Sequence, residues 1–109
     1  MIDLEIKHRV LVLKLSTTYL PDYQGFVFGS RVSGRARRFS DLDIALIGKL
    51  SIPMGRLADL REALSASVLP IFVDLIDLQS VSEDWRARVS AAMVPLNFDK
   101  GKTLSAPSG

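Results

Sequence analysis

One stretch, residues 25–48, constrains the fold of this chain more than any other. It reads GFVFGSRVSGRARRFSDLDIALIG, so that two short apolar runs enclose a turn, a basic segment and two closely spaced acids. Short apolar runs bounded by turn residues are typical of buried strands. The first run, Phe26–Phe28, and the second, Ile44–Ile47, therefore predict two strands with the polar segment between them.

The two acids, Asp41 and Asp43, lie at the start of the second predicted strand. Because side chains alternate between the faces of a strand, both carboxylates project from the same side. Carboxylates held this close repel each other unless a cation lies between them, and divalent metals bind such oxygen atoms. A DxD pair on its own is more typical of solvated acids at a strand edge, or of a turn at Asp41, so the interpretation depends on its neighbours.

A Gly-Ser dipeptide, Gly29–Ser30, follows the first predicted strand and precedes a short predicted helix at residues 30–35. Glycine allows the backbone to approach a ligand closely. A hydroxyl group beside the N–H groups of a helix start is a common way to bind phosphate. Together with the acids, the dipeptide predicts a phosphate loop that faces a metal-binding pair. We expect Mg²⁺, because the ligands are hard carboxylate and phosphate oxygens.

A third carboxylate is usually needed when two metals support phosphoryl or nucleotidyl transfer. The third apolar run, residues 71–78, predicts a strand and contains two candidates, Asp74 and Asp77. They are three residues apart and point to opposite faces of a regular strand, so at most one can join the acidic pair. Asp74 lies between apolar neighbours, where a carboxylate is costly to bury without a cation or a hydrogen-bonding partner. We therefore predict that Asp74 is the third carboxylate. Asp77 lies at the end of the strand, where an exposed or capping acid needs no such partner.

These motifs resemble those of the minimal nucleotidyltransferases, the smallest members of the DNA-polymerase-β-like superfamily. The shared signature is Gly29–Ser30, ten intervening residues and then Asp41-x-Asp43. In this family a third carboxylate lies in an apolar-Asp-apolar strand, which matches Asp74. The resemblance covers most of the chain, from the first predicted helix to about residue 93. It implies that an acceptor hydroxyl attacks the α-phosphorus of a nucleotide and releases pyrophosphate.

The predicted roles of the site residues follow from their charges. Asp41 and Asp43 would hold the metal ion on the triphosphate, while Gly29 and Ser30 would grip the phosphates. Asp74 would help to hold a second metal ion close to the attacking hydroxyl, either as its base or by lowering its pKa through that ion.

Four arginines fall within eight residues of the basic segment, at positions 31, 35, 37 and 38. One interpretation is a solvated loop or helix face. The alternatives are contact with the triphosphate, for which Arg31 is best placed beside Ser30, or a docking surface for an acidic or nucleic-acid partner. Aromatic residues are nearly absent there apart from Phe39, so the segment does not support a claim of direct nucleic-acid binding.

Three longer helices are predicted outside this stretch. One covers residues 2–19, although its run at 10–13 also fits a strand. The next begins near Pro53 and stops before Pro70, and the last opens with a capping box at Ser80. The apolar stripes of the first two are Ile2, Ile6, Val10 and Leu13, and Leu57, Leu60, Leu64 and Val68.

The order α-β-α-β-α-β-α predicts an α/β (α+β) domain in which helices pack on a small mixed sheet. By resemblance, this is the nucleotidyltransferase fold, similar to the palm of polymerase β. A chain of 109 residues suffices for one core and not for two. We expect the domain to span residues 1–96. Residues 97–109 are rich in Gly, Ser, Lys and Pro and are expected to be disordered.

Composition narrows the setting of this domain. No apolar run approaches the roughly 18–20 residues that cross a bilayer, so no membrane association is expected. The acidic N-terminus does not resemble a signal peptide, and the absence of cysteine excludes disulfides and thiolate metal sites. A cytoplasmic location is therefore expected. The net charge of +2 is too small to indicate nucleic-acid binding by itself.

A domain this small has little surface for both a nucleotide base and an acceptor, so another chain is expected to complete recognition. That chain would be a second copy, forming a homodimer, or a separate protein. The resemblance implies a small helical HEPN-domain protein, a ribonuclease toxin, with the nucleotidyltransferase as its antitoxin. In such pairs the antitoxin transfers AMP, here from ATP, typically onto a tyrosine hydroxyl of the toxin.

Two alternatives belong to other functional classes. In the first, the chain is a non-catalytic antitoxin that neutralises its partner by contact. In the second, it transfers a nucleotide to a small molecule such as an aminoglycoside. Longer chains with an added helical domain usually do this.

Overall fold

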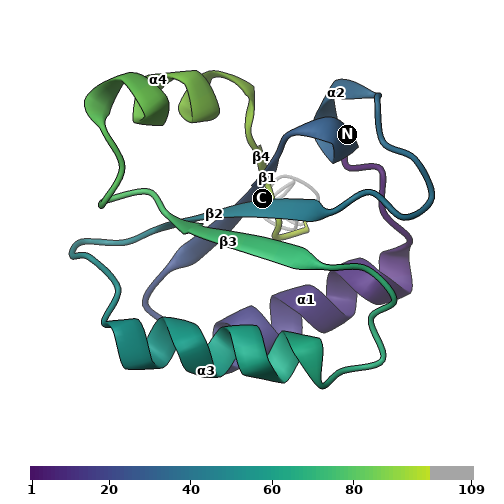
Figure 1. The fold of residues 1–109 in the computed structure, drawn as a ribbon, viewed down its shortest axis with the longest axis horizontal. Helices are drawn as coiled ribbons and strands as arrows, with labels where there is room; N and C mark the ends of the chain where they lie inside the picture. The colour runs from purple at the N-terminus through teal and green to yellow at the C-terminus, as the bar shows by residue number, and fades with distance from the viewer. Residues whose placement is uncertain (99–109) are drawn as a thin grey trace, which may run out of the picture.

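In the computed structural model, which describes residues 1–98, the chain folds into a four-stranded sheet with helices on both faces (Figure 1). The strands are β1 (Gln24–Phe28), β2 (Leu42–Ile47), β3 (Val73–Asp77) and β4 (Val94–Pro95). The helices are α1 (Ile6–Tyr19), α2 (Ser30–Ser33), α3 (Met54–Ser65) and α4 (Glu83–Ala92). The predicted α/β class and the predicted order of the first seven elements are confirmed.

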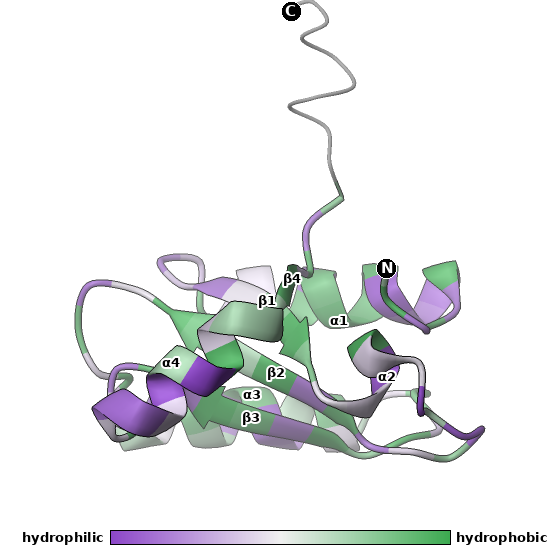
Figure 2. Ribbon diagram, turned by 90° about the horizontal axis from the view of Figure 1, so that it is seen from above, coloured by the Kyte–Doolittle hydropathy of each residue, from purple (hydrophilic) through white to green (hydrophobic). Residues whose placement is uncertain are grey.

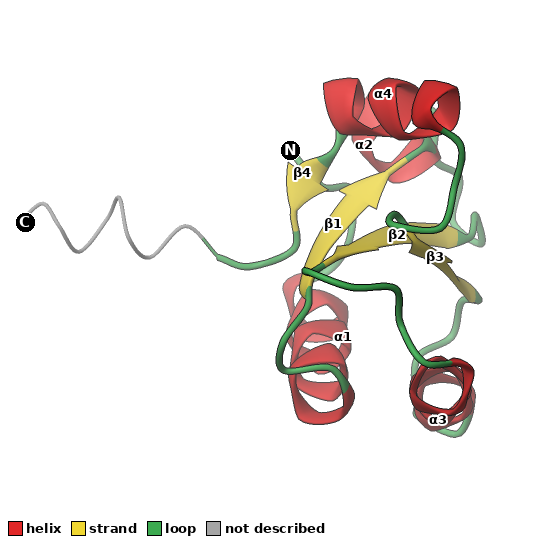
Figure 3. Ribbon diagram, turned by 90° about the vertical axis from the view of Figure 1, so that its left-hand side faces the viewer, coloured by secondary structure: helices red, strands yellow, loops and turns green. Residues whose placement is uncertain are grey.

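The strands lie in the order β3-β2-β1-β4, which makes the sheet mixed. β2 and β3 are parallel and are joined by α3, whereas β1 runs antiparallel to both β2 and β4. Figures 1 and 3 show α1 and α3 on one face of the sheet and α2 and α4 on the other. None of the helices formed by residues 1–98 has the length and apolarity to traverse a lipid bilayer.

Alternation along β2 explains the two layers. Leu42, Ile44 and Leu46 are fully buried in the main core, which α1 and α3 complete. Ala45 points to the other face and packs in a smaller cluster with Val89 of α4. The strands are accordingly the most hydrophobic part of the ribbon, while α4 is largely hydrophilic (Figure 2). Residues of β2 that lie two positions from Ala45 therefore also face the α4 side.

Helix α1 begins later and buries a different face than predicted. It starts at Ile6 rather than at residue 2. The predicted stripe is wrong at Ile6, which is 71% exposed, and at Val10, which is 46% exposed, whereas Ile2 is buried in the main core and Leu13 packs against it. Val12 and Ser16 are the residues that α1 buries. Between Val10 and Leu15 only Lys14 is polar, so the packing against α3, rather than the local pattern, decides which face is inside.

Helices α3 and α4 also differ from the prediction at their ends. α3 stops at Ser65, so Val68 lies outside it and is 89% exposed. The Ser67 hydroxyl donates to the Leu64 carbonyl at 2.6 Å and satisfies one of the last helical acceptors. At the start of α4 the cap is Ser82, whose Oγ accepts from the amide of residue 85. The predicted cap at Ser80 is therefore wrong by two residues.

Strand β4 was not predicted. It contains only two residues, one of them Pro95, which is compatible with the edge of a sheet but not with a central strand. The fully buried Leu96 follows it and donates its amide to the Gly25 carbonyl at 2.9 Å. Arg9 of α1 donates to the carbonyls of Leu96 and Asn97, each at 2.8 Å. Most of the predicted disordered tail, residues 99–109, lies outside the described residues.

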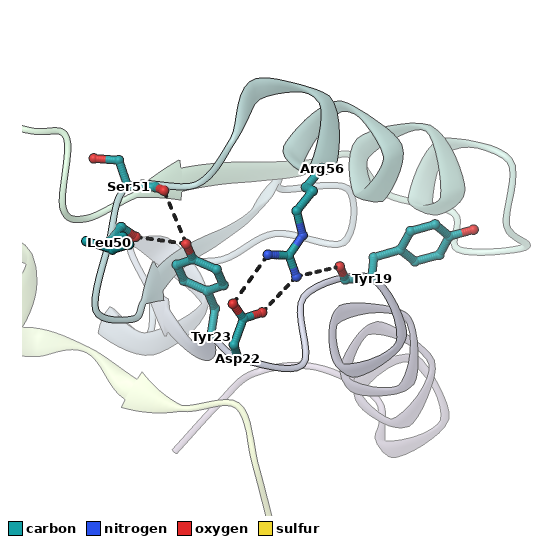
Figure 4. A network of polar contacts seen from close by, with 6 residues as sticks. All are labelled: Tyr19, Asp22, Tyr23, Leu50, Ser51 and Arg56. Carbon is teal, nitrogen blue, oxygen red and sulfur yellow. Dashed lines mark hydrogen bonds and ion pairs between the residues drawn. The ribbon is translucent and has the colours of Figure 1, made fainter.

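A polar network fastens one end of the sheet (Figure 4). Arg56 of α3 pairs with Asp22 at 2.7 Å, which lowers the pKa of that carboxyl below its usual value. The Tyr23 hydroxyl donates to the carbonyls of Leu50 and Ser51 at 2.8 and 3.2 Å. These contacts tie the turn before β1 to the loop after β2. The opposite end of these two strands carries the predicted acids.

Candidate active site

The strand register places two of the predicted acids side by side. Phe28 of β1 lies opposite Asp43 of β2, and Asp43 lies opposite Asp74 of β3. Directly paired residues in neighbouring strands project from the same face, and such strands lie about 4.7–4.9 Å apart. Asp41 precedes β2 and is two residues from Asp43, so it points to the same side. The three predicted carboxylates therefore share the α4 face of the sheet.

The three carboxylates lie close enough for their charges to act on one another. Partial burial raises the pKa of Asp43, and the negative charges of Asp74 and Asp41 raise it further. No ion pair formed within residues 1–98 involves any of the three. Nor do the described residues form a group of three acidic, histidine or cysteine side chains that could hold a metal ion. The site therefore concentrates negative charge that no cationic side chain among the described residues compensates.

Position 29 accommodates only glycine, because of its backbone conformation and because Asp43 lies beside it. Its φ of +79° and ψ of −150° are conformations that L residues with side chains rarely adopt. A Cβ atom built on Gly29 would also collide with the Asp43 carboxylate. Ser30 follows and begins α2, which ends at Gly34 with a φ of +86°. The predicted phosphate loop thus lies directly against the predicted metal ligand.

Asp77, the rejected candidate, has a structural role at the other end of the sheet. Its carboxylate accepts hydrogen bonds from the Ile52 amide at 2.8 Å, the Ser80 hydroxyl at 2.8 Å and the Gln79 side chain at 2.6 Å. Burial favours the neutral acid, but these hydrogen bonds outweigh it and lower the pKa of Asp77. Asp77 joins the loops after β2 and β3 and is removed from the other acids.

Residues 24–96 match the family model described as "Polymerase beta, Nucleotidyltransferase". The chain belongs to this family. This nucleotidyltransferase is 36% identical over 107 residues to "Probable protein adenylyltransferase MntA" of Haemophilus influenzae (strain ATCC 51907 / DSM 11121 / KW20 / Rd). The aligned region covers 98% of this chain and 93% of the relative.

Solved structures agree with this assignment. The nucleotidyltransferase is similar to a chain in the "Crystal structure of the toxin-antitoxin with AMP-PNP", with 30% identity, a TM-score of 0.69 and coverage of 90% of this chain and 80% of that one. It is also similar to a chain in the structure of a tri-AMPylated Shewanella oneidensis HEPN toxin in complex with MNT antitoxin. There the identity is 26%, the TM-score is 0.64, and coverage is 89% of this chain and 75% of that one. The predicted family and its polymerase-β-like fold are confirmed.

Arg31 has a role in the nucleotidyltransferase that sequence reasoning missed. Its side chain is buried, with only 7% exposed. The guanidinium donates to the Ser40 carbonyl and to the Asp3 carbonyl, both at 2.8 Å, and to carbonyls of residues 37 and 38 at longer distances. Arg31 therefore holds the loop that leads into Asp41. Its predicted contact with the triphosphate stays a prediction, and these hydrogen bonds leave it few free donors.

The other three arginines of the basic segment are exposed, as the solvated-loop interpretation expects. Arg38 stacks over the ring of Phe39, with 5.3 Å between the guanidinium carbon and the ring centroid. No pattern in the sequence distinguishes Arg31 from these neighbours. Its buried position depends on carbonyl groups contributed by the N-terminus and by the loop, which lie apart in the sequence.

Proposed function

We propose that this nucleotidyltransferase is an antitoxin that transfers AMP from ATP, with Mg²⁺, to a tyrosine hydroxyl of a partner HEPN-domain toxin. The observation that carries the proposal is the uncompensated row of Asp43 and Asp74, with Asp41 beside it and Gly29 packed against it. Such an arrangement suits a divalent metal ion, which would lie between these carboxylates and the negatively charged triphosphate, better than any neutral ligand.

The donor set fits Mg²⁺. This ion typically binds through one or two carboxylates together with substrate phosphates and water, so it does not need an enclosed protein cage. Asp41 and Asp43 would hold the ion on the triphosphate, Asp74 would help to hold a second, and Gly29 and Ser30 would bind phosphate oxygens. When bound, Mg²⁺ neutralises phosphate charge and makes a nearby hydroxyl more acidic.

Asp74 would serve the acceptor. The tyrosine oxygen forms a bond to the α-phosphorus while its proton passes to the Asp74 carboxylate. The bond from the α-phosphorus to the bridging oxygen breaks, and pyrophosphate leaves with the electron pair. Asp74 suits this role because it is exposed, so that a hydroxyl from another chain can reach it.

The similar proteins support the partner and the reaction. One is named as a protein adenylyltransferase, and another lies in a complex with an AMP-carrying HEPN toxin. The similarity covers 98% of this chain and 93% of the curated relative, so the proposal applies to the whole length of the described domain. A homodimer and a cytoplasmic location stay predictions.

Transfer of label from α-³²P-ATP to a HEPN-domain protein from the same genome tests the proposal. We expect label on the partner that survives denaturation, requires Mg²⁺ and disappears with the Asp41→Ala/Asp43→Ala double variant. If the two proteins bind tightly without labelling, and the double variant still neutralises the partner, the chain acts by contact instead. Label found on an aminoglycoside rather than on the partner would identify the small-molecule alternative.

A further inference from the structure

A cavity of about 290 Å³ opens beside the phosphate loop, between the end of β1 and α4. It is lined by Phe28, Gly29, Trp85, Arg88, Val89 and Ala92. None of these except Gly29 belongs to the site described above.

The cavity adjoins the carboxylates directly. Phe28 is in register with Asp43, so both side chains lie on the α4 face of the sheet. Gly29 forms one wall of the cavity and packs against the Asp43 carboxylate on its other side. A molecule whose phosphates lie at Gly29 and Ser30 can therefore extend its remaining part into the cavity.

The lining has the chemistry of a stacking site. The rings of Phe28 and Trp85 meet edge to face, with centroids 6.1 Å apart and an interplanar angle of 86°. Trp85 is 38% exposed, so part of this residue stays accessible to a ligand although it contacts Phe28. Arg88 is largely exposed, and its one ion pair, with Asp84, is long at 3.6 Å. The cavity thus offers aromatic and apolar surface with one cation at its edge.

We propose that this cavity binds the base of the nucleoside triphosphate, with Trp85 as the stacking surface. The inference rests on the proposed function, because that function places the phosphates at Gly29 and Ser30. Stacking on an aromatic ring tolerates every base, since each has a π face. Arg88 is the only charged side chain of the lining and the indole N–H of Trp85 its only other side-chain donor, so little can read the hydrogen-bonding edge of the base. We therefore expect ATP and GTP to bind with affinities within about tenfold of each other.

Trp85 is the only tryptophan of the chain, so its fluorescence reports directly on this cavity. The full chain is titrated with Mg²⁺ and AMP-PNP, followed by both fluorescence and calorimetry, and separately with Mg²⁺ and inorganic tripolyphosphate. We expect AMP-PNP to change the fluorescence and tripolyphosphate to bind without doing so. Trp85→Ala should weaken AMP-PNP binding about 10- to 100-fold and leave tripolyphosphate binding within about twofold. Trp85→Phe, which keeps an aromatic ring, should retain most of the affinity. It is the control that separates loss of the stacking surface from a general effect of changing this position.

The outcomes separate this inference from the proposed function. If AMP-PNP binds by calorimetry but neither the fluorescence nor the Trp85→Ala affinity changes, the base lies elsewhere while the proposed function stands. If AMP-PNP does not bind at all, both fail. If Trp85→Ala keeps its nucleotide affinity but binds the HEPN partner more weakly, this face contacts protein and the inference is overturned.

Discussion

At the scale of single residues, the environment that would make Asp43 a metal ligand also opposes folding. Partial burial, then Asp74 and Asp41, raise the pKa of this carboxyl in the folded state above its usual value of 3.8. Between the unfolded and folded pKa values the folded state binds more protons, so the contribution of Asp43 to stability falls as the pH rises through this window. At neutral pH the ionised group is therefore unfavourable unless a cation is bound.

We expect Asp43→Asn to raise the melting temperature at pH 7 in the absence of Mg²⁺, because the amide removes this repulsion. The gain should shrink toward pH 4, where Asp43 becomes protonated, and transfer activity should fall at least about 100-fold because a Mg²⁺ ligand is lost. Thermal unfolding from pH 4 to pH 7, with and without Mg²⁺, measures the effect. A lower melting temperature for the variant at pH 7 would show that Asp43 stabilises the fold.

Asp74 and Asp77 form a matched pair on one strand. Asp74 is exposed and faces the other acids, so we expect Asp74→Asn to abolish most transfer while changing stability by less than about 0.5 kcal/mol. Asp77 accepts several hydrogen bonds, so Asp77→Asn should lower the free energy of unfolding by about 1–3 kcal/mol. Urea unfolding and initial rates of labelling distinguish the two effects. If Asp74→Asn lost stability and Asp77→Asn lost transfer instead, the two roles would have to be exchanged.

Gly29 and Gly34 offer a second comparison, since both have positive φ. A Cβ on Gly34 would meet nothing within 4 Å, so Gly34→Ala should cost only about 1–2 kcal/mol of backbone strain and keep transfer. Gly29→Ala adds a collision with Asp43 and should reduce transfer at least about 100-fold. Melting temperature and labelling rate are measured for both variants. Equal activity of the two would mean that closeness to Asp43 has no importance for the reaction.

At the scale of elements, Arg31 supports the loop between α2 and β2. We expect Arg31→Lys to lower the free energy of unfolding by about 2–4 kcal/mol, since one ammonium group cannot replace several guanidinium hydrogen bonds, which contribute about 1.5–3 kcal/mol each when charged. It should also weaken binding of Mg²⁺ with AMP-PNP, because the loop leads into Asp41. The exposed Arg35, changed to Lys, is the control and should shift stability by less than about 0.5 kcal/mol. Indistinguishable unfolding curves for the two variants would rule out this support.

The elements also show which features could be predicted from sequence. The strands of Asp43 and Asp74 were predictable because alternation and turn residues are local signals, and Gly29 was predictable from its spacing to the acids. The buried role of Arg31 was not, because its acceptors come from separate segments. The face of α1 and the cap of α4 likewise depend on packing partners rather than on nearby residues. The positions of these residues in the fold were therefore easier to predict than the contacts that support them.

At the scale of the whole molecule, the last described residues pack against elements from the first part of the chain. β4 pairs with β1, and Arg9 near the start of the chain binds carbonyls that follow β4. Leu96, fully buried in the main core, lies at this junction. The segment after α4 is thus part of the core and not an appendage to it.

We expect Leu96→Ala to lower the free energy of unfolding by about 2–5 kcal/mol, the usual cost of a cavity left by a buried leucine. Val68→Ala, at a position that is 89% exposed, should change it by less than about 0.5 kcal/mol. Both are measured by urea unfolding of the full chain. The labelling rate of folded Leu96→Ala should stay within about threefold of the parent, because Leu96 lies on the core side of the sheet, away from the acids. A loss of stability as small as that of Val68→Ala would mean that the core does not depend on this segment.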